Sequence, residues 1–123
     1  MVCKTHFYVV EICTYIMYII GMADKHYYGF VWDENKAALN KQKHGISFET
    51  AVLVFQDPML LEIYDIDSSE DEDRYDVIGS VLGRLITFVV YTERNQEKRI
   101  ISARPATSFE RKKYYENIAS LQS

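Results

Sequence analysis

The chain has 123 residues, a formal net charge of −4 and a hydrophobic content of 48%, with 14% aromatic residues. These values predict one folded domain, since domains commonly hold about 100–150 residues, and they exclude a largely disordered chain. The acidic balance argues against a protein that coats nucleic acid with its whole surface. It does not exclude a local basic cleft, because the distribution of charge sets the local field.

The first 21 residues differ in composition from the rest of the chain. The run FYVVEICTYIMYII (7–20) is apolar, but it is interrupted by Glu11 and is shorter than the roughly 20 residues that a membrane-spanning helix needs. Three interpretations fit this segment: a signal peptide with Lys4 as its charged start, a membrane attachment, or an over-extended reading frame whose true start is Met22. Glu11 argues against the signal peptide.

Both cysteines, Cys3 and Cys13, lie in this first segment. The sequence contains no CxxC pair, no paired Cys/His spacing and no HExxH motif, so we expect neither a structural zinc site nor a disulfide framework. The two cysteines are interpreted as free thiols in a reducing cytoplasm.

A strand followed by two helices is predicted after residue 30. FVW (30–32) is typical of a short strand, Asp33 is a good N-cap for a helix over 34–44, and Gly45 is a typical helix stop. A second helix follows Ser47 as its cap, because apolar residues recur at helical spacing. These apolar residues are Phe48, Ala51, Val52 and Phe55.

The sequence period then changes from helical to extended. Four segments rich in β-branched and aromatic residues are predicted strands, with turns at Leu82-Gly83 and at RNQE (94–97). The segments are 59–65, 74–81, 84–93 and 98–104. Thr107 and Glu110 form a capping box that opens a final helix.

This order of elements predicts an α+β fold. Sequential strands joined by short turns pair antiparallel, so we expect an antiparallel sheet of about four to five strands, with two N-terminal helices and one C-terminal helix. The helices would cover one face of the sheet. The other face and the strand ends would remain available for a site.

The charges are segregated along the chain. Residues 65–76 are strongly acidic, with Arg74 as their single cation. Cations gather at the end of the first helix and from residue 94 onward. They are Lys36, Lys41, Lys43, His44, Arg94, Lys98, Arg99, Arg104, Arg111, Lys112 and Lys113. If the first helix packs beside the last strands, these side chains form one wall of an anion site, and phosphate is the natural anion.

Several of these residues also have a purely structural explanation, although Arg94, Arg99 and Arg104 are harder to explain in that way. Helix lysines such as Lys41 commonly form a solvated face, and His44 can stabilise the C-terminal dipole of its helix. Arg99 and Arg104 have opposite strand parity, so a regular strand directs them to opposite faces unless Arg104 turns off the strand end. Tyr114 fits packing in the core as well as stacking on a base.

Three segments carry several separate motifs in a fixed order. They are FVWDENKAALNKQKHGISFETAVLVF, DRYDVIGSVLGRLITFVVYTER and RIISARPATSFERKKYYE, which run from about Phe30 to Glu116. The patterns W-D-x-x-K, N-x-x-K-H-G-x-S-F, a strand ending in Y-T-E-R, and I-S-A-R-x-A-T followed by E-R resemble the BrnT family of bacterial type II toxins. Asp73 departs mildly from the family, which more often has Glu there, and residues 1–21 have no counterpart in it.

The resemblance implies a RelE-like fold and a metal-independent endoribonuclease that cleaves RNA, inhibits translation and arrests growth in the bacterial cytoplasm, without a cofactor. It implies a BrnA-like antitoxin as partner, in a hetero-oligomer such as a 2:2 complex. Contact with DNA would come only through the antitoxin, and no membrane is involved. Family members begin just before the first motif, which favours Met22 as the start. We therefore predict an extra segment over 1–21 and a single toxin domain over 22–123.

Cleavage of RNA without a metal needs a base for the 2′-hydroxyl, cations for the developing phosphorane and an acid for the leaving oxygen. In our hypothesis Arg94, Arg104 and Lys43 supply the positive charge, with Arg99 as a secondary candidate. His44 transfers a proton. Glu93 or Tyr114 is the second proton-transfer group. The predicted catalytic residues are His44, Lys43, Glu93, Arg94, Arg104 and Tyr114. The predicted RNA-binding residues are Lys36, Arg99, Arg111 and Lys112.

The alternative is a catalytically inactive partner of a DNA-binding antitoxin. In that case the same basic face only docks the antitoxin, and the acidic loop 65–76 contacts a basic segment. A ribonuclease needs the cations for turnover, whereas a docking module needs only shape and charge.

Overall fold

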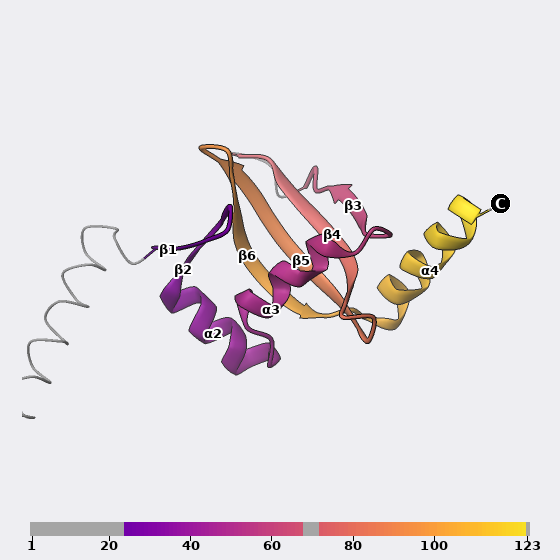
Figure 1. Cartoon of the computed structure of the whole chain (residues 1–123), viewed down its shortest axis with the longest axis horizontal. Coiled ribbons are helices and arrows are strands. Elements are labelled where there is room, and N and C mark those ends of the chain that lie inside the picture. Colours follow the sequence, from indigo (N-terminus) through magenta and orange to yellow (C-terminus); the bar gives the residue numbers. More distant parts are fainter. Residues whose placement is uncertain (1–23, 68–71, 123) are drawn as a thin grey trace, which may run out of the picture.

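The computed structural model of the chain describes residues 24–67 and 72–122. In these residues six strands form one sheet, accompanied by α-helices and a short 3-10 helix (Figure 1). The strands are β1 (Asp24–Tyr27), β2 (Phe30–Asp33), β3 (Leu61–Tyr64), β4 (Arg74–Val81), β5 (Leu85–Arg94) and β6 (Glu97–Pro105). The helices are α2 (Glu34–His44), α3 (Phe48–Val52), the 3-10 helix Leu53–Gln56 and α4 (Ser108–Gln122). The predictions for residues 1–21, their cysteines and the start at Met22 lie outside the described residues.

The strands lie in the order β1-β2-β6-β5-β4-β3. Neighbouring strands are antiparallel except β2 and β6, which are parallel. The predicted α+β class is therefore confirmed, but the expectation of a wholly antiparallel sheet with four to five strands is wrong. We did not predict β1 because its sequence, DKHY, is short and polar. The parallel pair was not predicted because its strands are far apart in the chain and no short turn joins them.

The predicted helix caps are confirmed. Asp33 and Ser47 each accept a backbone hydrogen bond at the start of a helix, and Gly45 ends α2 with a φ of 76° that favours glycine. The Thr107 hydroxyl accepts from the N–H of Glu110 at 3.2 Å, and the Glu110 carboxylate accepts from the N–H of Thr107 at 2.8 Å. The second predicted helix is α-helical only over Phe48–Val52 and continues as the 3-10 helix.

One face of the sheet is covered by α2, α3 and the 3-10 helix, and we call it the closed face. Figure 1 shows α3 crossing in front of the strands. Trp32 and Phe48 are fully buried there, with ring centroids 5.8 Å apart. At Gly79 an added Cβ would lie 2.7 Å from Val54, so β4 and the 3-10 helix pack closer than any side chain allows. The buried residues are Trp32, Ile46, Phe48, Ala51, Val52, Val54, Val77, Val81, Val89, Tyr91, Ile100 and Ala103.

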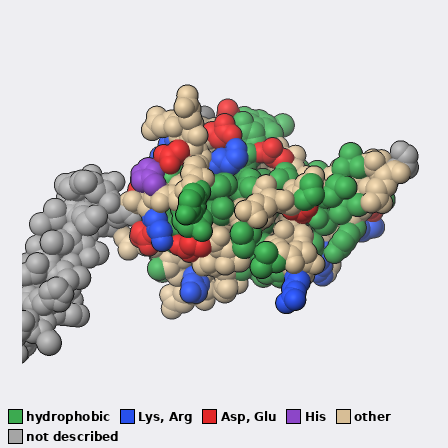
Figure 2. Space-filling view, in the orientation of Figure 1, with side chains coloured by type: hydrophobic (Ala, Val, Ile, Leu, Met, Phe, Trp, Pro, Cys, Tyr) green, Lys and Arg blue, Asp and Glu red, His purple; other side chains and the backbone are tan. Residues whose placement is uncertain are grey.

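Viewed from the helix side, hydrophobic side chains also reach the surface, in a band that runs from the middle of the molecule onto α4 (Figure 2). On α4, Phe109 and Leu121 are each more than half exposed. No helix within residues 24–67 or 72–122 has the length and hydrophobicity that crossing a bilayer requires.

A β-bulge in β6 decides which residues face away from the core. The register between β5 and β6 shifts between Val90 and Tyr91, which pair with Ser102 and Ile100, so Ile101 is an extra residue. Because of this residue, Ile100 and Ala103 both belong to the closed-face core, although they are three positions apart.

Arg99 and Arg104 flank those two core residues and therefore both face away from the core. The guanidinium of Arg104 lies 4.2 Å from the ring centroid of Phe88, which belongs to a second cluster. Strand parity alone predicted opposite faces for the two arginines, and this was wrong because the bulge resets the alternation.

Candidate functional site

The face opposite α2 and α3, which we call the open face, presents three rows of side chains from β4, β5 and β6. The rows, read from the strand register, are Arg74, Thr92 and Arg99; Asp76, Val90 and Ser102; and Ile78, Phe88 and Arg104. Helix α4 packs at the third row of this face, where Tyr114 and Ile118 contact the cluster around Ile78, so the expectation that the helices cover only one face was wrong for α4. The first two rows are polar except for Val90 and lie beyond this cluster.

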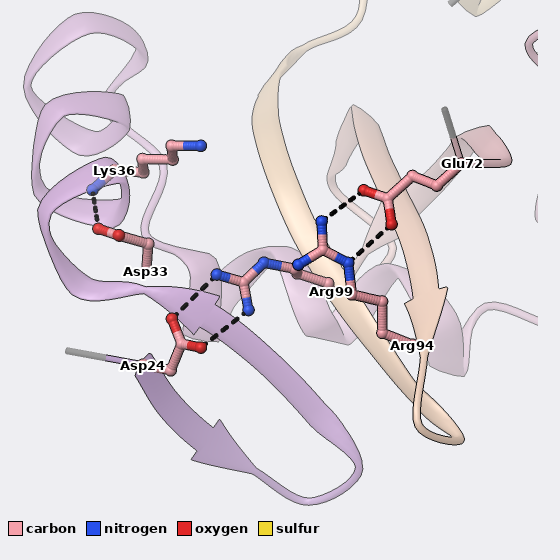
Figure 3. A network of polar contacts seen from close by, with 6 residues as sticks. All are labelled: Asp24, Asp33, Lys36, Glu72, Arg94 and Arg99. Carbon is pink, nitrogen blue, oxygen red and sulfur yellow. Dashed lines mark hydrogen bonds and ion pairs between the residues drawn. The ribbon is translucent and has the colours of Figure 1, made fainter. Parts of the chain in front are cut away.

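Arg94 and Arg99 lie side by side at one end of the open face, and each guanidinium is held by a carboxylate (Figure 3). Arg94 donates from Nε and Nη2 to Glu72, both at 2.7 Å. Arg99 donates from Nη1 and Nη2 to Asp24, at 3.0 and 2.9 Å. These hydrogen bonds hold the pKa of Glu72 and of Asp24 below their usual values, because they stabilise the ionised form.

Arg104 is held in the same way at the other end. It donates from Nη1 and Nη2 to Glu110 at 2.7 and 2.9 Å, and its plane packs on Phe88. The hydrogen bonds raise the pKa of Arg104 and lower the pKa of Glu110. The capping box at the start of α4 therefore also fixes this arginine, because the Glu110 carboxylate accepts hydrogen bonds from both Thr107 and Arg104.

The carboxylate pairs position the arginines without using all their donors. A guanidinium carries five N–H groups, and each pair with Glu72 or Asp24 uses two of them. Donors therefore remain for a phosphate oxygen. The carboxylates also cancel part of the positive charge, so an anionic ligand has to compete with them.

In the first two rows of the open face, two buried polar atoms have no hydrogen-bond partner among the described residues. They are Asp76 Oδ1 and Thr92 Oγ1. Burial raises the pKa of Asp76, the negative charges of Asp65 and Glu110 raise it further, and Arg104 opposes them. Buried polar atoms usually have a partner, so this surface suits contact with water or a ligand. We did not predict either residue; the available signal was an aspartate inside the strand RYDVIGSV.

Strand β1, which we did not predict, brings two more polar residues to this face. Asp24 is the partner of Arg99, and the His26 Nδ1 atom lies 3.0 Å from an oxygen of Glu97. The sequence offered no signal for either, because only pairing with β2 turns this polar tetrapeptide into a strand.

The predicted cations of α2 have no direct contact with these arginines in the part of the chain that the structure describes. Helix α2 lies against the edge of β6, where the Asn40 side chain donates to the carbonyl of Ala103 and accepts from its N–H, at 2.8 and 3.1 Å. Lys43 and His44 are in the last turn of α2. Lys36 binds through its backbone N–H to Asp33. The structure thus brings Arg94 and Arg99 together but joins none of these three side chains to them.

The predicted acid–base groups other than His44 also have structural partners. Glu93 forms an ion pair with Lys98 at 3.0 Å, and the Lys98 ammonium lies 5.0 Å from the Tyr91 ring, which places this pair on the closed side. The Tyr114 hydroxyl donates to Asp57 at 2.5 Å and is buried. Burial and this hydrogen bond raise the pKa of Tyr114.

Tyr114 also lines a pocket of about 460 Å³ beneath α4. The pocket is lined by Leu53, Gln56, Asp57, Pro58, Ser80, Leu82, Gly83, Ile86, Tyr114, Tyr115 and Ile118. The predicted RNA contacts on α4 are engaged near their own positions. Arg111 donates to the Ala106 carbonyl just before α4 and to the Ser108 hydroxyl, and Lys112 lies 3.9 Å from Glu116.

Comparison with known proteins agrees with the resemblance seen in the sequence. The model of the family described as "Ribonuclease toxin, BrnT, of type II toxin-antitoxin system" matches residues 32–110. The crystal structure of the Brucella abortus ribonuclease toxin BrnT is similar, with a TM-score of 0.50 and 25% sequence identity, over 63% of this chain and 94% of that chain. No curated protein sequence matches the chain. The matched range includes Arg94, Arg99 and Arg104 but not strand β1.

Proposed function

The chain belongs to the BrnT family of ribonuclease toxins of type II toxin–antitoxin systems, and we propose that it is a metal-independent endoribonuclease that binds RNA on the open face of its sheet. The observation that carries this proposal is the presence of Arg94, Arg99 and Arg104 on one face, each held in a fixed orientation by a carboxylate. Arginines presented in this way suit phosphate oxygens, which accept the same planar pairs of hydrogen bonds as carboxylates.

The phosphodiester would lie against Arg94 and Arg99, with Arg104 contacting a neighbouring phosphate. Fixed guanidinium groups stabilise the charge that builds up on a phosphorane without reorganising, and such electrostatic stabilisation is commonly the largest catalytic contribution. The attacking group would be the 2′-hydroxyl, which restricts the reaction to RNA. In this proposal the protein's own cations supply the positive charge that the transition state needs.

Three residues of α2 are also predicted from the sequence to act on RNA. Lys43 and His44 are predicted to be catalytic, and Lys36 is predicted to bind RNA. They stay predictions that depend on substrate bridging from the sheet to the end of α2. Glu93 and Tyr114 are weaker candidates for proton transfer, since Lys98 and Asp57 respectively already bind them.

The partner follows from the family. A type II system includes a protein antitoxin, and we propose a BrnA-like one, joined in a 2:2 complex, through which alone the toxin reaches DNA. We also propose that residues 22–123 form the toxin domain, that the fold belongs to the RelE-like superfamily, and that the protein inhibits translation in the cytoplasm.

A second candidate function is that of an inactive docking partner. The observation that favours it is the local neutrality of the open face, where Glu72, Asp24 and Glu110 already satisfy the arginines. An antitoxin could exchange its own carboxylates for these without any turnover of RNA.

Cleavage of RNA by the purified chain in EDTA tests the proposal, with the Arg94→Ala and Arg104→Ala variants alongside. We expect products with 2′,3′-cyclic phosphate ends from the wild type and at least a ten-fold loss in each variant. Should the folded wild type cleave neither free RNA nor ribosome-bound mRNA, and cause no growth arrest on expression, the docking function replaces the ribonuclease.

A further inference from the structure

One end of the open face carries a histidine that belongs to neither the sequence motifs nor the matched range of the family. His26 lies in β1 and pairs with Val31 of β2. Its neighbour Lys25 pairs with Trp32 and forms an ion pair with Glu49 of α3, at 3.2 Å, on the closed side. Because side chains alternate along a strand, His26 extends to the open side.

Contacts around the ring confirm this placement. His26 Nδ1 lies 3.0 Å from Glu97 Oε2, and Glu97 pairs in register with Arg94 across the β5–β6 hairpin. Two residues before His26, Asp24 binds Arg99. The pKa of Asp24 is lowered by the hydrogen bonds from Arg99 and further by the charges of Arg99, His26 and Arg94, so all these groups lie within electrostatic reach of each other.

The contact with Glu97 assigns the tautomer of the ring. An ionised carboxylate only accepts hydrogen bonds, so the hydrogen of neutral His26 has to be on Nδ1. The lone pair is then on Nε2. The His26 side chain is 65% exposed, so a substrate on the open face can reach it. A carboxylate that orients an imidazole in this way is a recurrent arrangement for a general base.

We propose that His26 is the general base of RNA cleavage, oriented by Glu97 and placed beside the phosphate site of Arg94 and Arg99. This inference depends on the proposed ribonuclease function. In the step, Nε2 takes the proton of the 2′-hydroxyl, the 2′-oxygen forms a bond to phosphorus, and the bond from phosphorus to the 5′-oxygen breaks. Water protonates the leaving 5′-oxygen, and the hydroxide that remains takes the proton from Nε2. The products are a 2′,3′-cyclic phosphate and a 5′-hydroxyl, and His26 is neutral again. Electrons and protons balance without any other reactant.

The test measures kcat/KM for a mixed RNA substrate from pH 5 to pH 9 in EDTA, using the full chain and three single variants. They are His26→Gln, Glu97→Gln and His44→Gln. General base catalysis contributes roughly 10²–10⁴-fold, so we expect His26→Gln to lose at least about 100-fold and to lose the acidic limb of the pH profile. Binding of a 2′-O-methyl RNA, which has no 2′-hydroxyl to deprotonate, should change little.

Glu97→Gln separates an oriented base from an ion pair that only stabilises β1. The glutamine keeps the side-chain shape but loses the charge that fixes the tautomer, so we expect a smaller loss of kcat, about ten-fold, at an unchanged KM. The charged groups around His26 are Glu97, which contacts its ring, and the cluster of Asp24, Arg94 and Arg99. A shift of that limb in Glu97→Gln would be the signature of coupling between Glu97 and His26.

The outcomes distinguish this inference from the proposed function. If the wild type cleaves RNA and folded His26→Gln cleaves it equally, with the same pH profile, His26 is not the base and the ribonuclease function stands. Loss of the acidic limb in His44→Gln instead would assign the base to the end of α2 and would overturn our inference. A wild type that cleaves no RNA would overturn both proposals.

Discussion

The two faces of the same sheet differ in what their side chains need from their surroundings. On the closed face, Trp32, Phe48 and Val89 are fully buried against α2 and α3. On the open face, Arg94 and Arg99 are held by carboxylates that use two of the five N–H donors of each guanidinium. The closed face stabilises the fold because its apolar side chains are removed from water. The open face keeps polar groups whose best partners lie outside the chain. Stability and activity should therefore respond separately to substitutions on the two faces.

The largest expected effect is on the closed face. Trp32→Ala removes a fully buried aromatic side chain, and replacing such residues costs about 3–5 kcal/mol of unfolding free energy. Urea denaturation measures this loss. The folded fraction should still bind RNA, since the open face is intact. A variant as stable as the wild type would mean that this core does not stabilise the fold.

A substitution on the open face should lower RNA cleavage rather than stability. Arg99→Ala removes one fixed cation, and the loss of such a group typically lowers cleavage by about 100-fold. Its partially exposed pair with Asp24 should contribute at most about 1 kcal/mol to stability, as measured by thermal unfolding.

Lys25→Ala is the matched control for that arginine. Lys25 is also a β-sheet cation with an acidic partner, Glu49, but it lies on the closed side. Cleavage by this variant should equal that of the wild type. Equal losses in Lys25→Ala and Arg99→Ala would show that total charge, rather than the face, determines activity.

Tyr114 lies at the boundary between the core and the open face. Removing its hydroxyl tests whether this group contributes to stability or to cleavage. Tyr114→Phe deletes the hydrogen bond to Asp57 and should cost about 1 kcal/mol with no change in cleavage. A large loss of cleavage in folded Tyr114→Phe would restore the catalytic role that the sequence suggested.

The pH dependence of that loss has a definite sign. Burial alone would raise the pKa of Asp57, but hydrogen bonds from Tyr114 and from the backbone of Ser80 and Met59 lower it. A carboxyl with a lowered folded pKa stabilises the fold above its unfolded pKa, and this contribution is lost as the pH falls through the folded pKa. Tyr114→Phe should therefore cost more at pH 7 than at pH 2.

The smallest expected effect on the unfolding free energy is a gain of stability rather than a loss. The pKa of Asp76 is raised by burial, so its ionised form is disfavoured in the folded state. Asp76→Asn should stabilise the protein at pH 7 by up to about 1 kcal/mol, and the gain should vanish below the unfolded pKa, where Asp76 is protonated in both states. Thermal unfolding at pH 7 and pH 3 measures this difference, and a loss of stability at pH 7 would contradict it.

The sequence predicted the local features of both faces well. Caps at Asp33 and Ser47, the stop at Gly45 and the box of Thr107 with Glu110 depend on short-range hydrogen bonds, which a few adjacent residues determine. The strands β4 to β6 follow one another through short turns, so their pairing was also predictable.

The site was less predictable because it depends on pairings between distant segments. The shared face of Arg99 and Arg104 comes from a bulge that no residue pattern announces. Asp24 and His26 reach the open face only because β2 pairs with β6, which the order of elements alone does not predict. The clustering of cations in the sequence identified the arginines but not their partners.

The most direct test of the account is an NMR titration with 2′-O-methyl RNA that follows side-chain N–H signals on both faces. We expect the Nε–H signals of Arg94, Arg99 and Arg104 to shift, while the indole N–H of Trp32 stays unchanged. Shifts confined to Lys36, Lys43 and His44 on α2, with the three arginines unaffected, would contradict the assignment of RNA binding to the open face.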